Sequence, residues 1–562
     1  MPPKLDTLAS IAHAVQGYTA ISINAFTPEF VLGIGFLLTI LLDALTSRAA
    51  SKRFSIYFAV IVLAVAGGFA IPQWHGFDPL HAREWKGGSL VFPYSLTMFP
   101  PNISAGAIVH GYAMAVVDNF SVFFKLLVSI AGILVLLMSL ASRKLQEQPK
   151  RLGEYSSLIL GMSIGLYLMP ASMDLIMMYV SLELSSIAGY LLAGFFRQSE
   201  HGAEASLKYI LFGALSSGLM IYGFSLFYGL TGTTNIIAIQ QVLTLNPATH
   251  TGMNVYILWA GTLLVLAGMG YKVSAVPFHF WTPDVYEGAP VPITALLSVA
   301  SKAAGFGMLI RFLVLIFPES GRNAPPLIDW HFAIAVLAVL TMTFGNFAAL
   351  LQSNVRRMLA YSTIAHSGYM LAALATVSLA YGRVSGIVAI VIYLTVYLFM
   401  QLGAFFVVEL IGNKISSEEL EDYRGLMSRT PLAATALVIF LVSLTGIPLT
   451  AGFVGKFYLL TSLLTPDAGS HGVPFLWLGV AVILNSVISL YYYLRVAAAM
   501  FLKRSVATDR ISEEMIPHNR IQYSLPVTLL LLVLVIPILL FGVYFQPLVD
   551  LASGVIQMFF IR

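Results

Sequence analysis

Three lysines and a glutamate stand inside long apolar stretches of this chain. Lys272, Lys302 and Lys456 each lie in a different stretch, and Glu183 lies in a fourth. A charged side chain at a bilayer centre costs about 2.5–3.5 kcal/mol on insertion scales, so the four together cost roughly 10 kcal/mol. Such groups usually face a bundle interior or a wet cavity, where they pair or carry ions. Because lysine also loses its proton readily on burial, this row of residues predicts a proton path through a membrane.

The composition is that of an integral membrane protein. Of the 562 residues, 58% are hydrophobic and only 10% are charged, whereas a soluble domain has about 25% charged residues. Runs near the ~20 apolar residues that span a bilayer recur along the chain, and they lack the alternation of β-barrel strands. We therefore predict an all-α polytopic bundle of fourteen transmembrane helices. They begin near Phe30, Phe54, Ala113, Tyr155, Ser172, Ala203, Asn254, Ala289, His331, Met358, Gly386, Pro431, Pro474 and Leu525.

The distribution of charge orients the bundle. If loops alternate between the two sides, 17 of the 30 Lys and Arg residues fall on one side and 7 on the other, Arg311 among the latter, with six inside spans. By the positive-inside rule the 17-residue side is cytoplasmic, so both termini are expected on the outer side. No removable signal peptide is apparent. The basic loops orient the protein, and nothing suggests nucleic-acid binding. The absence of cysteine excludes thiolate-ligated iron–sulfur clusters and disulfides within this chain.

Two spans are predicted to be broken. The segments Gly268–Pro277 and Leu444–Lys456 each combine Gly and Pro with a lysine, and proline disrupts a helix where the unwound chain can line a cavity. These are spans seven and twelve, five apart, so a five-helix repeat would be inverted in its second copy, and matched interruptions point to the transport site. We expect an N-terminal unit of three helices (1–150) with an outer loop (73–111), two repeats (151–320 and 321–505) and a C-terminal helix (506–562).

Each lysine also has a structural interpretation. In that interpretation Lys272 and Lys456, beside the breaks, only neutralise the carbonyl end of a half-helix. Lys302 lies in mid-span among small residues that permit water entry. Glu183 is central in its span and Lys208 begins the next one, so adjacent antiparallel helices are expected to bring the two together. As a fixed salt bridge this pair would be structural, and as a changing one it would alter the proton affinity of the next lysine inward.

Two histidines are possible relays between the lysines, because imidazole titrates near neutrality. His279 is the stronger candidate and His366 the weaker one, and a hydrogen-bonded core role competes for both. Lys125 and Arg495 are expected to snorkel or pair locally. We find no Gly-rich phosphate loop, metal cluster or nucleophile motif.

The motifs themselves resemble those of a known family. The segment Pro277–Pro290, the pair Ser301-Lys302, and the segments Glu204–Tyr209, Gly452–Phe457 and Arg356–Tyr369 are similar to the antiporter-like membrane subunits of respiratory complex I, the bacterial NADH–quinone oxidoreductase. The resemblance extends from about 154 to 464, and the form of Trp281–Pro290 is typical of the N type.

The resemblance implies a fold and roles for particular residues. It implies fourteen helices with inverted five-helix repeats, and proton translocation driven by quinone reduction elsewhere in the complex. By position, Glu183 would be the acidic partner, Lys208 its salt-bridge lysine, Lys272 the broken-helix lysine, Lys302 the central relay and Lys456 the exit-side lysine. NADH, FMN, iron–sulfur clusters and quinone would bind partner subunits, and this chain would carry no cofactor. Its partners would be the other membrane subunits, neighbouring antiporter-like subunits included, in the lipid bilayer of the bacterial inner membrane.

Three other functions fit the same residues. A subunit of a multi-subunit sodium/proton antiporter would exchange ions without a quinone substrate. A related membrane hydrogenase or quinone reductase would use another electron donor, which never touches this chain. A purely structural scaffold would tolerate neutral replacements of Lys272 and Lys302.

Overall fold

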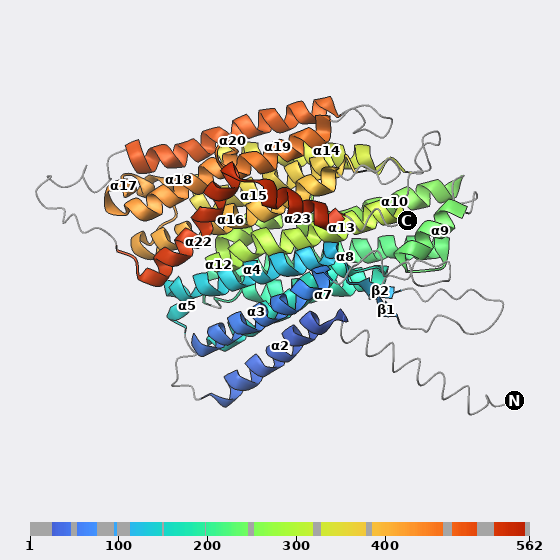
Figure 1. Ribbon diagram of the computed structural model, residues 1–562, viewed down its shortest axis with the longest axis horizontal. Coiled ribbons are helices and arrows are strands. Elements are labelled where there is room, and N and C mark those ends of the chain that lie inside the picture. The colour runs from blue at the N-terminus through green and yellow to red at the C-terminus, as the bar shows by residue number, and fades with distance from the viewer. Residues whose placement is uncertain are drawn as a thin grey trace, which may run out of the picture.

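The computed structural model describes most of the chain as an elongated helical bundle. The described residues are 25–46, 53–75, 95–97, 113–148, 151–196, 198–245, 252–317, 328–377, 385–464, 475–502 and 522–556. Figure 1 shows that most of the long helices run roughly along the longest axis of the molecule. Many of their exposed side chains are large and apolar, such as Leu215, Leu263 and Val487, as expected of helices that face lipid.

The fourteen predicted spans correspond to helices of the structure. Among the described residues, twelve helices are long and apolar enough to cross a membrane. Eleven of these are α2 (Thr27–Leu45), α3 (Arg53–His75), α4 (Asn119–Ala141), α6 (Leu152–Ala171), α7 (Leu175–Ala193), α8 (Glu200–Thr231), α10 (Met253–Val273), α14 (Trp330–Leu350), α16 (Ser385–Ile415), α20 (Leu476–Leu502) and α22 (Leu525–Val543), and the twelfth joins α12 (Val291–Leu296), η4 (Leu297–Ser301) and α13 (Lys302–Ile316). The other two are the more polar α15 (Val355–Leu374) and a span divided into α18 (Pro431–Thr445) and α19 (Ala451–Leu464).

Both predicted breaks are present. After α10 the chain turns through residues 274–280 before α11 (Trp281–Gly288), and Ser274 ends α10 in the left-handed region with φ 60°. After α18, Gly446 adopts φ 87°, a conformation that glycine reaches without strain. Long unbroken helices precede both breaks, since α8 has 32 residues and α16 has 31. The same order of elements thus occurs twice, whereas the inverted relation and the unit boundaries stay predictions.

A small β-ribbon supplements the helices. Strand β1 (Ser95–Thr97) pairs antiparallel with β2 (Ala113–Val116), at the end of the bundle where α4 begins (Figure 1). Most of the predicted outer loop (73–111) lies outside the described residues. The loops between the long helices contain three short ones, namely α5 (Arg143–Gln146), α9 (Ile236–Leu245) and α17 (Leu426–Arg429). A further helix, α23 (Gln546–Ile556), follows α22.

Among the described residues, many Lys and Arg side chains gather at one end of the bundle. Short helices α5 and α17 lie at the same end in Figure 1, and α9 lies at the other. The first end carries Arg143, Lys144, Lys414, Arg424 and Arg429, and we call it the basic end. One predicted loop charge was placed wrongly: Arg311 is not in a loop but fully buried inside α13.

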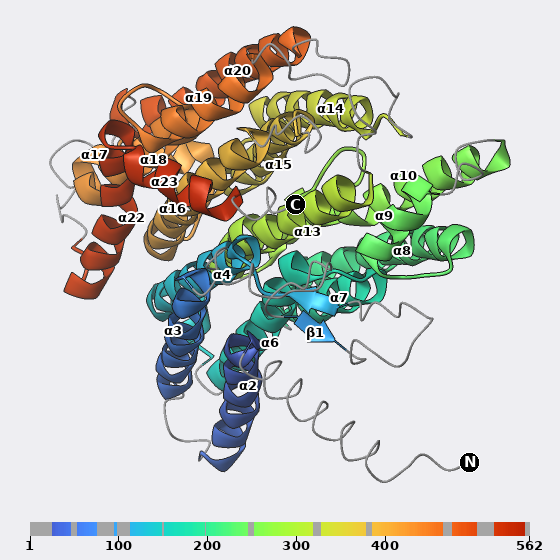
Figure 2. The ribbon, with the colours of Figure 1, turned by 45° about the vertical axis from the view of Figure 1, so that its right-hand side comes forward.

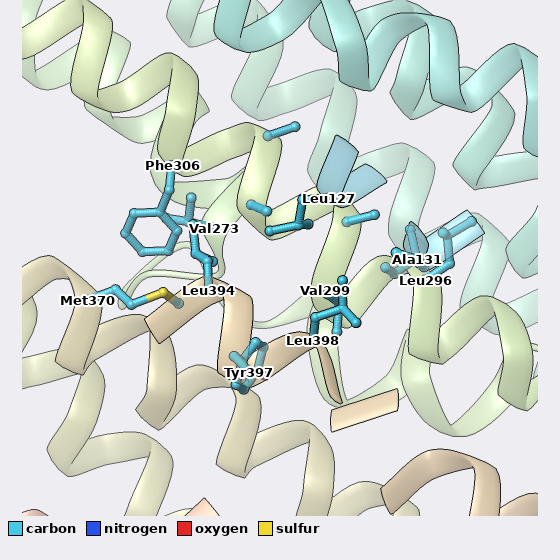
Figure 3. Close-up of a cluster of buried hydrophobic side chains, with 14 of the residues drawn as sticks. Leu127, Ala131, Val273, Leu296, Val299, Phe306, Met370, Leu394, Tyr397 and Leu398 are labelled. Carbon is cyan, nitrogen blue, oxygen red and sulfur yellow. The ribbon is translucent and has the colours of Figure 1, made fainter. Parts of the chain in front are cut away.

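Apolar side chains join the units in the centre. Figure 2 shows α13 near the middle of the bundle, with α10 on one side and α15 on the other. Figure 3 shows side chains from α4, α10, α12, η4, α13, α15 and α16 in one buried cluster, in which Leu127, Leu296, Val299, Phe306 and Leu398 are labelled. The polar residues described next are therefore held by a close-packed core.

Candidate functional site

Lys272 lies at the end of α10, immediately before the first break. Its side chain is 1% exposed, and its Nζ donates to the hydroxyls of Ser185 at 2.9 Å and Ser186 at 3.2 Å on α7. The close approach of α6 to α7 needs Gly165, because a Cβ there would lie 2.6 Å from the backbone nitrogen of Ser185. The break and the α6–α7 packing thus place a buried amine against two hydroxyls.

Glu183 is the acidic group nearest to this lysine along α7. It precedes Ser186 by three residues, which places both on one face of the helix, and its carboxylate interacts electrostatically with Lys272. Its Oε1 is buried and makes no hydrogen bond to any described residue. Glu183 therefore acts on Lys272 through space, without a direct ion pair.

Lys302 begins α13, directly after the π-helical turn η4. The lysine is 1% exposed, and its Nζ donates to the carbonyl oxygen of Thr363 at 2.9 Å and to the hydroxyl of Ser367 at 3.1 Å, both on α15. Such π-turns inside α-helices are frequent at functional sites. One turn further along α13, a Cβ on Gly305 would lie 3.2 Å from Cγ of Lys272, so the stem of Lys272 packs on the helix that carries Lys302.

His366 lies between Lys302 and the last lysine. It is 1% exposed on α15, and its Nδ1 is 2.5 Å from the hydroxyl of Tyr393, while its Nε2 is 3.2 Å from that of Tyr493. It interacts electrostatically with both Lys302 and Lys456. The sequence ranked His366 below His279, and the two tyrosines were missed because nothing local in the sequence marks them.

Lys456 lies on α19, just after the second break. It is 5% exposed, and its Nζ donates to the carbonyl oxygen of Thr445 at 2.8 Å, the last residue of α18. The ammonium also lies 4.7 Å from the ring centroid of Tyr369. The ammonium of Lys456 thus binds the free carbonyl end of the half-helix α18. This is the structural role that the sequence offered for Lys456 as the alternative to proton transfer.

The remaining buried cations are bound differently. Lys125 on α4 contacts Glu29 at 2.7 Å, with side chains 0% and 8% exposed. Arg311 forms an ion pair with Asp118, which caps α4. In contrast, within the described ranges no carboxylate lies within ion-pairing distance of Lys272, Lys302 or Lys456, which donate only to hydroxyl and carbonyl oxygens.

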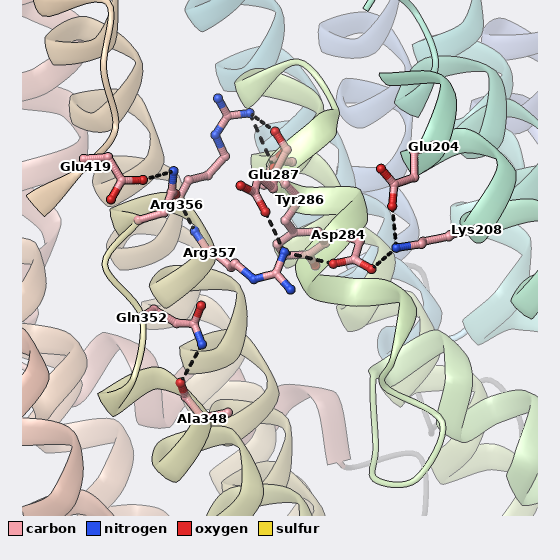
Figure 4. Close-up of polar contacts among 12 residues, drawn as sticks. Glu204, Lys208, Asp284, Tyr286, Glu287, Ala348, Gln352, Arg356, Arg357 and Glu419 are labelled. Carbon is pink, nitrogen blue, oxygen red and sulfur yellow. Dashed lines mark hydrogen bonds and ion pairs between the residues drawn. The ribbon is translucent and has the colours of Figure 1, made fainter. Parts of the chain in front are cut away.

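The predicted contact between Glu183 and Lys208 is wrong. The Nζ of Lys208 instead contacts Glu204 and Asp284, each at 2.6 Å, as Figure 4 shows. The reason is helix rotation: Tyr209 packs against Tyr190 on α7, and Lys208, one residue earlier, points about 100° away around α8, toward α11.

Asp284 lies at the centre of a charged cluster near the basic end. Besides Lys208, it binds Arg357 on α15 at 2.9 Å, and Arg357 also binds Glu287 at 2.5 Å. Figure 4 shows these contacts between α8, α11 and α15. The cluster thus ties both predicted repeats together on one side of the bundle.

His279 lies in the first break, apart from the lysines. Its ring packs against Phe280 and Phe344, with centroid distances of 4.5 and 4.4 Å, and its Nδ1 has no hydrogen-bond partner among the described residues. No hydrogen bond joins His279 to any of the three lysines among the described residues.

Lys125 and Arg495 were each expected to snorkel or to pair locally, and both are paired. Arg495 donates to the carbonyl oxygens of Leu350 and Gln352, and the fully buried Lys125 contacts Glu29.

Comparison with known proteins identifies the family. Residues 172–488 match the family described as "NADH:quinone oxidoreductase/Mrp antiporter, TM". "NADH-quinone oxidoreductase subunit N 2" of Chloroherpeton thalassium is 41% identical over 94% of each chain, and subunit N of Chlorobium chlorochromatii is 40% identical over the same shares. A chain of respiratory complex I from Thermus thermophilus superposes with a TM-score of 0.67 at 26% identity, over 94% of this chain and all of that one. The chain therefore belongs to the family of NADH:quinone oxidoreductase and Mrp antiporter membrane subunits, and its resemblance to the N type is confirmed.

Proposed function

We propose that this chain is a proton-translocating membrane subunit of an NADH–quinone oxidoreductase. Its family and its relatives named subunit N support a membrane subunit of that enzyme complex. Quinone reduction and the cofactors NADH, FMN and iron–sulfur clusters belong to partner subunits in this proposal. The chain would lie in the bacterial inner membrane beside other antiporter-like subunits, with the basic end toward the cytoplasm and both termini outside.

The observation that supports proton transport best is the lack of counter-charges around the three lysines. A buried charge without a partner is costly in free energy, and structural ion pairs such as Lys125–Glu29 avoid that cost. Lys272, Lys302 and Lys456 are as deeply buried, yet no described carboxylate pairs with them. Groups in such sites can lose and regain a proton with modest changes in nearby charge.

The contacts suggest an order for the path. Glu183 acts electrostatically on Lys272, whose stem packs against the helix of Lys302 at Gly305. Lys302 binds Thr363 and Ser367 on α15, on either side of His366 in the sequence, and His366 interacts electrostatically with Lys456. We infer that a proton entering near Lys272 moves through Lys302 and His366 to Lys456, with water between the groups that do not touch.

Lys272 tests the proposal because arginine and methionine separate charge from proton transfer. Arginine keeps the positive charge but is not deprotonated in proteins, whereas methionine removes the charge and keeps much of the length. A proton carrier should fail in both Lys272→Arg and Lys272→Met, and a structural counter-charge should survive in Lys272→Arg. The measurement is quinone-coupled proton uptake in membrane vesicles that contain the assembled complex.

The exposed Lys414 provides the matched control, because Lys414→Met removes a lysine charge at the basic end without touching the path. It should pump normally. If Lys272→Arg pumps at the wild-type rate, Lys272 is no proton carrier and the scaffold function is favoured. If proton uptake by the intact complex requires sodium, the antiporter alternative is favoured instead.

A further inference from the structure

The ammonium group of Lys456 lies over the aromatic ring of Tyr369. Its Nζ is 4.7 Å from the ring centroid, within the distance at which the negative face of an aromatic ring attracts a cation. Tyr369 is 1% exposed and Lys456 is 5% exposed, so little water weakens this attraction. Among the described residues, neither Lys272 nor Lys302 has such a contact with a ring.

We propose that Tyr369 is a positioning residue for Lys456, and that its ring takes the place of a carboxylate as the partner of the protonated amine. The inference rests on the proposed function, since it names the group that holds Lys456 while the lysine carries its proton. An ion pair such as Lys125–Glu29 fixes a positive charge with a full negative charge. A ring attracts the cation without a full negative charge, so it holds the charged amine and still lets the proton leave.

The second break shapes the other side of this site. The Nζ of Lys456 donates to the carbonyl oxygen of Thr445 at 2.8 Å. The next residue, Gly446, packs against the stem of the lysine, because a Cβ there would lie 2.8 Å from Cδ of Lys456. The glycine thus leaves room for the stem. The ammonium is held between a carbonyl oxygen of α18 and an aromatic ring of α15.

A buried hydrogen-bond network holds the ring in place. Asn346 on α14 donates from Nδ2 to the hydroxyl of Tyr369 at 3.0 Å, and its Oδ1 accepts from the hydroxyl of Tyr492 on α20 at 3.0 Å. The same Nδ2 also donates to Oδ1 of Asn485 at 3.1 Å. All four residues are at most 4% exposed. Because a buried network of bonded groups is rigid, α14 and α20 fix the position of the ring.

Close packing of α14 on α15 makes this network possible. A Cβ on Gly345 would lie 2.6 Å from a backbone nitrogen of α15, and one on Gly368 would lie 2.5 Å from a backbone nitrogen of α14. Gly345 directly precedes Asn346, and Gly368 directly precedes Tyr369. The two glycines thus bring the helices together at the level where the amide of Asn346 meets the hydroxyl of Tyr369.

The other ionisable groups around Lys456 lie on three of the helices packed against α19. His366 on α15 interacts electrostatically with the lysine, and Tyr393 on α16 packs against α19. Glu409 lies sixteen residues beyond Tyr393, about 24 Å along the same helix. Arg495 on α20 binds backbone carbonyls at the end of α14. The helices α18 and α22 contain no ionisable residue. The ring of Tyr369 is therefore the aromatic face that the charge of Lys456 meets.

Fluorinated phenylalanines at position 369 separate the charge of the ring face from its packing, because fluorine withdraws electrons from the face and changes the shape little. A desolvated cation–π contact changes a protonation equilibrium about tenfold or more. A weaker contact lets the amine lose its proton at lower pH. We therefore expect the alkaline limb of quinone-coupled proton uptake to move to lower pH by about one unit, from Tyr369→Phe through monofluorophenylalanine to trifluorophenylalanine. The measurement is the pH profile of uptake in vesicles that contain the assembled complex.

Tyr492 provides the matched control. It belongs to the same network and is fully buried, but no cation lies over its ring among the described residues. The same fluorinated residues at position 492 should leave the pH profile of Tyr492→Phe unchanged. If both positions respond alike, the rings act by packing and the positioning role of Tyr369 is wrong.

Removal of the whole ring gives a second measure of the contact. Tyr369→Leu should move the alkaline limb at least as far as trifluorophenylalanine does, and a profile equal to that of the wild type would contradict the positioning role. If this variant does not assemble into the complex, the fluorinated series still decides, because its members keep the shape of the ring.

Lys456→Met separates the positioning role from the proposed function. If it abolishes uptake while the fluorinated residues at position 369 keep the profile of Tyr369→Phe, the positioning role is wrong and the proposed function stands. If Lys456→Met pumps normally across the pH range, Lys456 is no proton carrier. The proposed function then fails at this residue, and the positioning role fails with it.

Discussion

Lys208 binds Asp284, with 2.6 Å between the lysine Nζ and the carboxylate oxygen. The contact joins α8 to the short helix α11 that follows the first break. Because Asp284 also binds Arg357 on α15, the loss of this one carboxylate would release contacts in both predicted repeats. The pair lies at the charged, partly exposed edge of the bundle, away from the buried lysines.

Double-mutant cycles should detect this partner of Lys208. Partly exposed ion pairs contribute about 1 kcal/mol or less, so Lys208→Met alone should destabilise the chain slightly. Combined with Asp284→Asn, its effect should be less than additive, whereas combined with Glu183→Gln it should be additive, because only contacting residues couple. The measurement is the temperature at which half of the detergent-solubilised chain loses its folded peak in size-exclusion chromatography. Coupling of Lys208 to Glu183 instead would contradict the assignment.

The two histidines should respond differently to the same substitution. His366→Gln removes a ring that bridges Tyr393 and Tyr493 between two lysines, and we expect proton uptake to fall at least about tenfold. His279→Gln changes a ring packed between two phenylalanines and should leave uptake close to the wild-type rate. Both are measured in vesicles with the assembled complex. If His279→Gln slows uptake and His366→Gln does not, the proton passes through His279 in the first break and not through His366.

Loss of either partner of the buried ion pair between Asp118 and Arg311 should destabilise the bundle strongly. Both side chains are at most 2% exposed, and Arg311 also donates to the carbonyl oxygen of Pro170. Removing one partner of a buried pair strands a charge and costs about 3–5 kcal/mol, so Asp118→Asn and Arg311→Met should each lower the midpoint of heat unfolding strongly.

The double variant Asp118→Asn/Arg311→Met should be milder than the sum of the two single variants. The exposed pair Arg143–Glu147, with side chains 70% and 60% exposed, is the control, and Arg143→Met should change stability by less than about 1 kcal/mol. Equal effects at the two pairs would mean that burial of Arg311 does not matter for stability.

The orientation of the bundle can be tested with single cysteines, because the chain has none of its own. Glu147, which follows α5 at the basic end, is 60% exposed, and Met253 at the start of α10 is 72% exposed. A membrane-impermeant maleimide should label Glu147→Cys only from the cytoplasm and Met253→Cys only from outside. Labelling of both from one side would contradict the alternating spans, and the reverse pattern would invert the bundle.

The sequence alone determined the number of spans and the position of both breaks. Hydropathy is a sum over neighbouring residues, and Gly and Pro act on their own backbone, so local composition predicts a break near each of the segments 268–277 and 444–456. The structure has these breaks at 274–280 and 446–450. The buried state of Lys272, Lys302 and Lys456 followed in the same way, because each sits deep within an apolar stretch.

Only the tertiary structure decided which side chains meet. A shift of one residue turns a side chain about 100° around its helix, so the rotation of α8 sent Lys208 to Asp284 and away from Glu183. For the same reason the sequence favoured His279 over His366 as a relay, although His366 is the histidine that interacts with two of the lysines. The sequence also placed Arg311 in a loop, whereas it is buried inside the bundle. Contacts between helices depend on how all the spans pack against one another. A local pattern of residues carries no information about that packing.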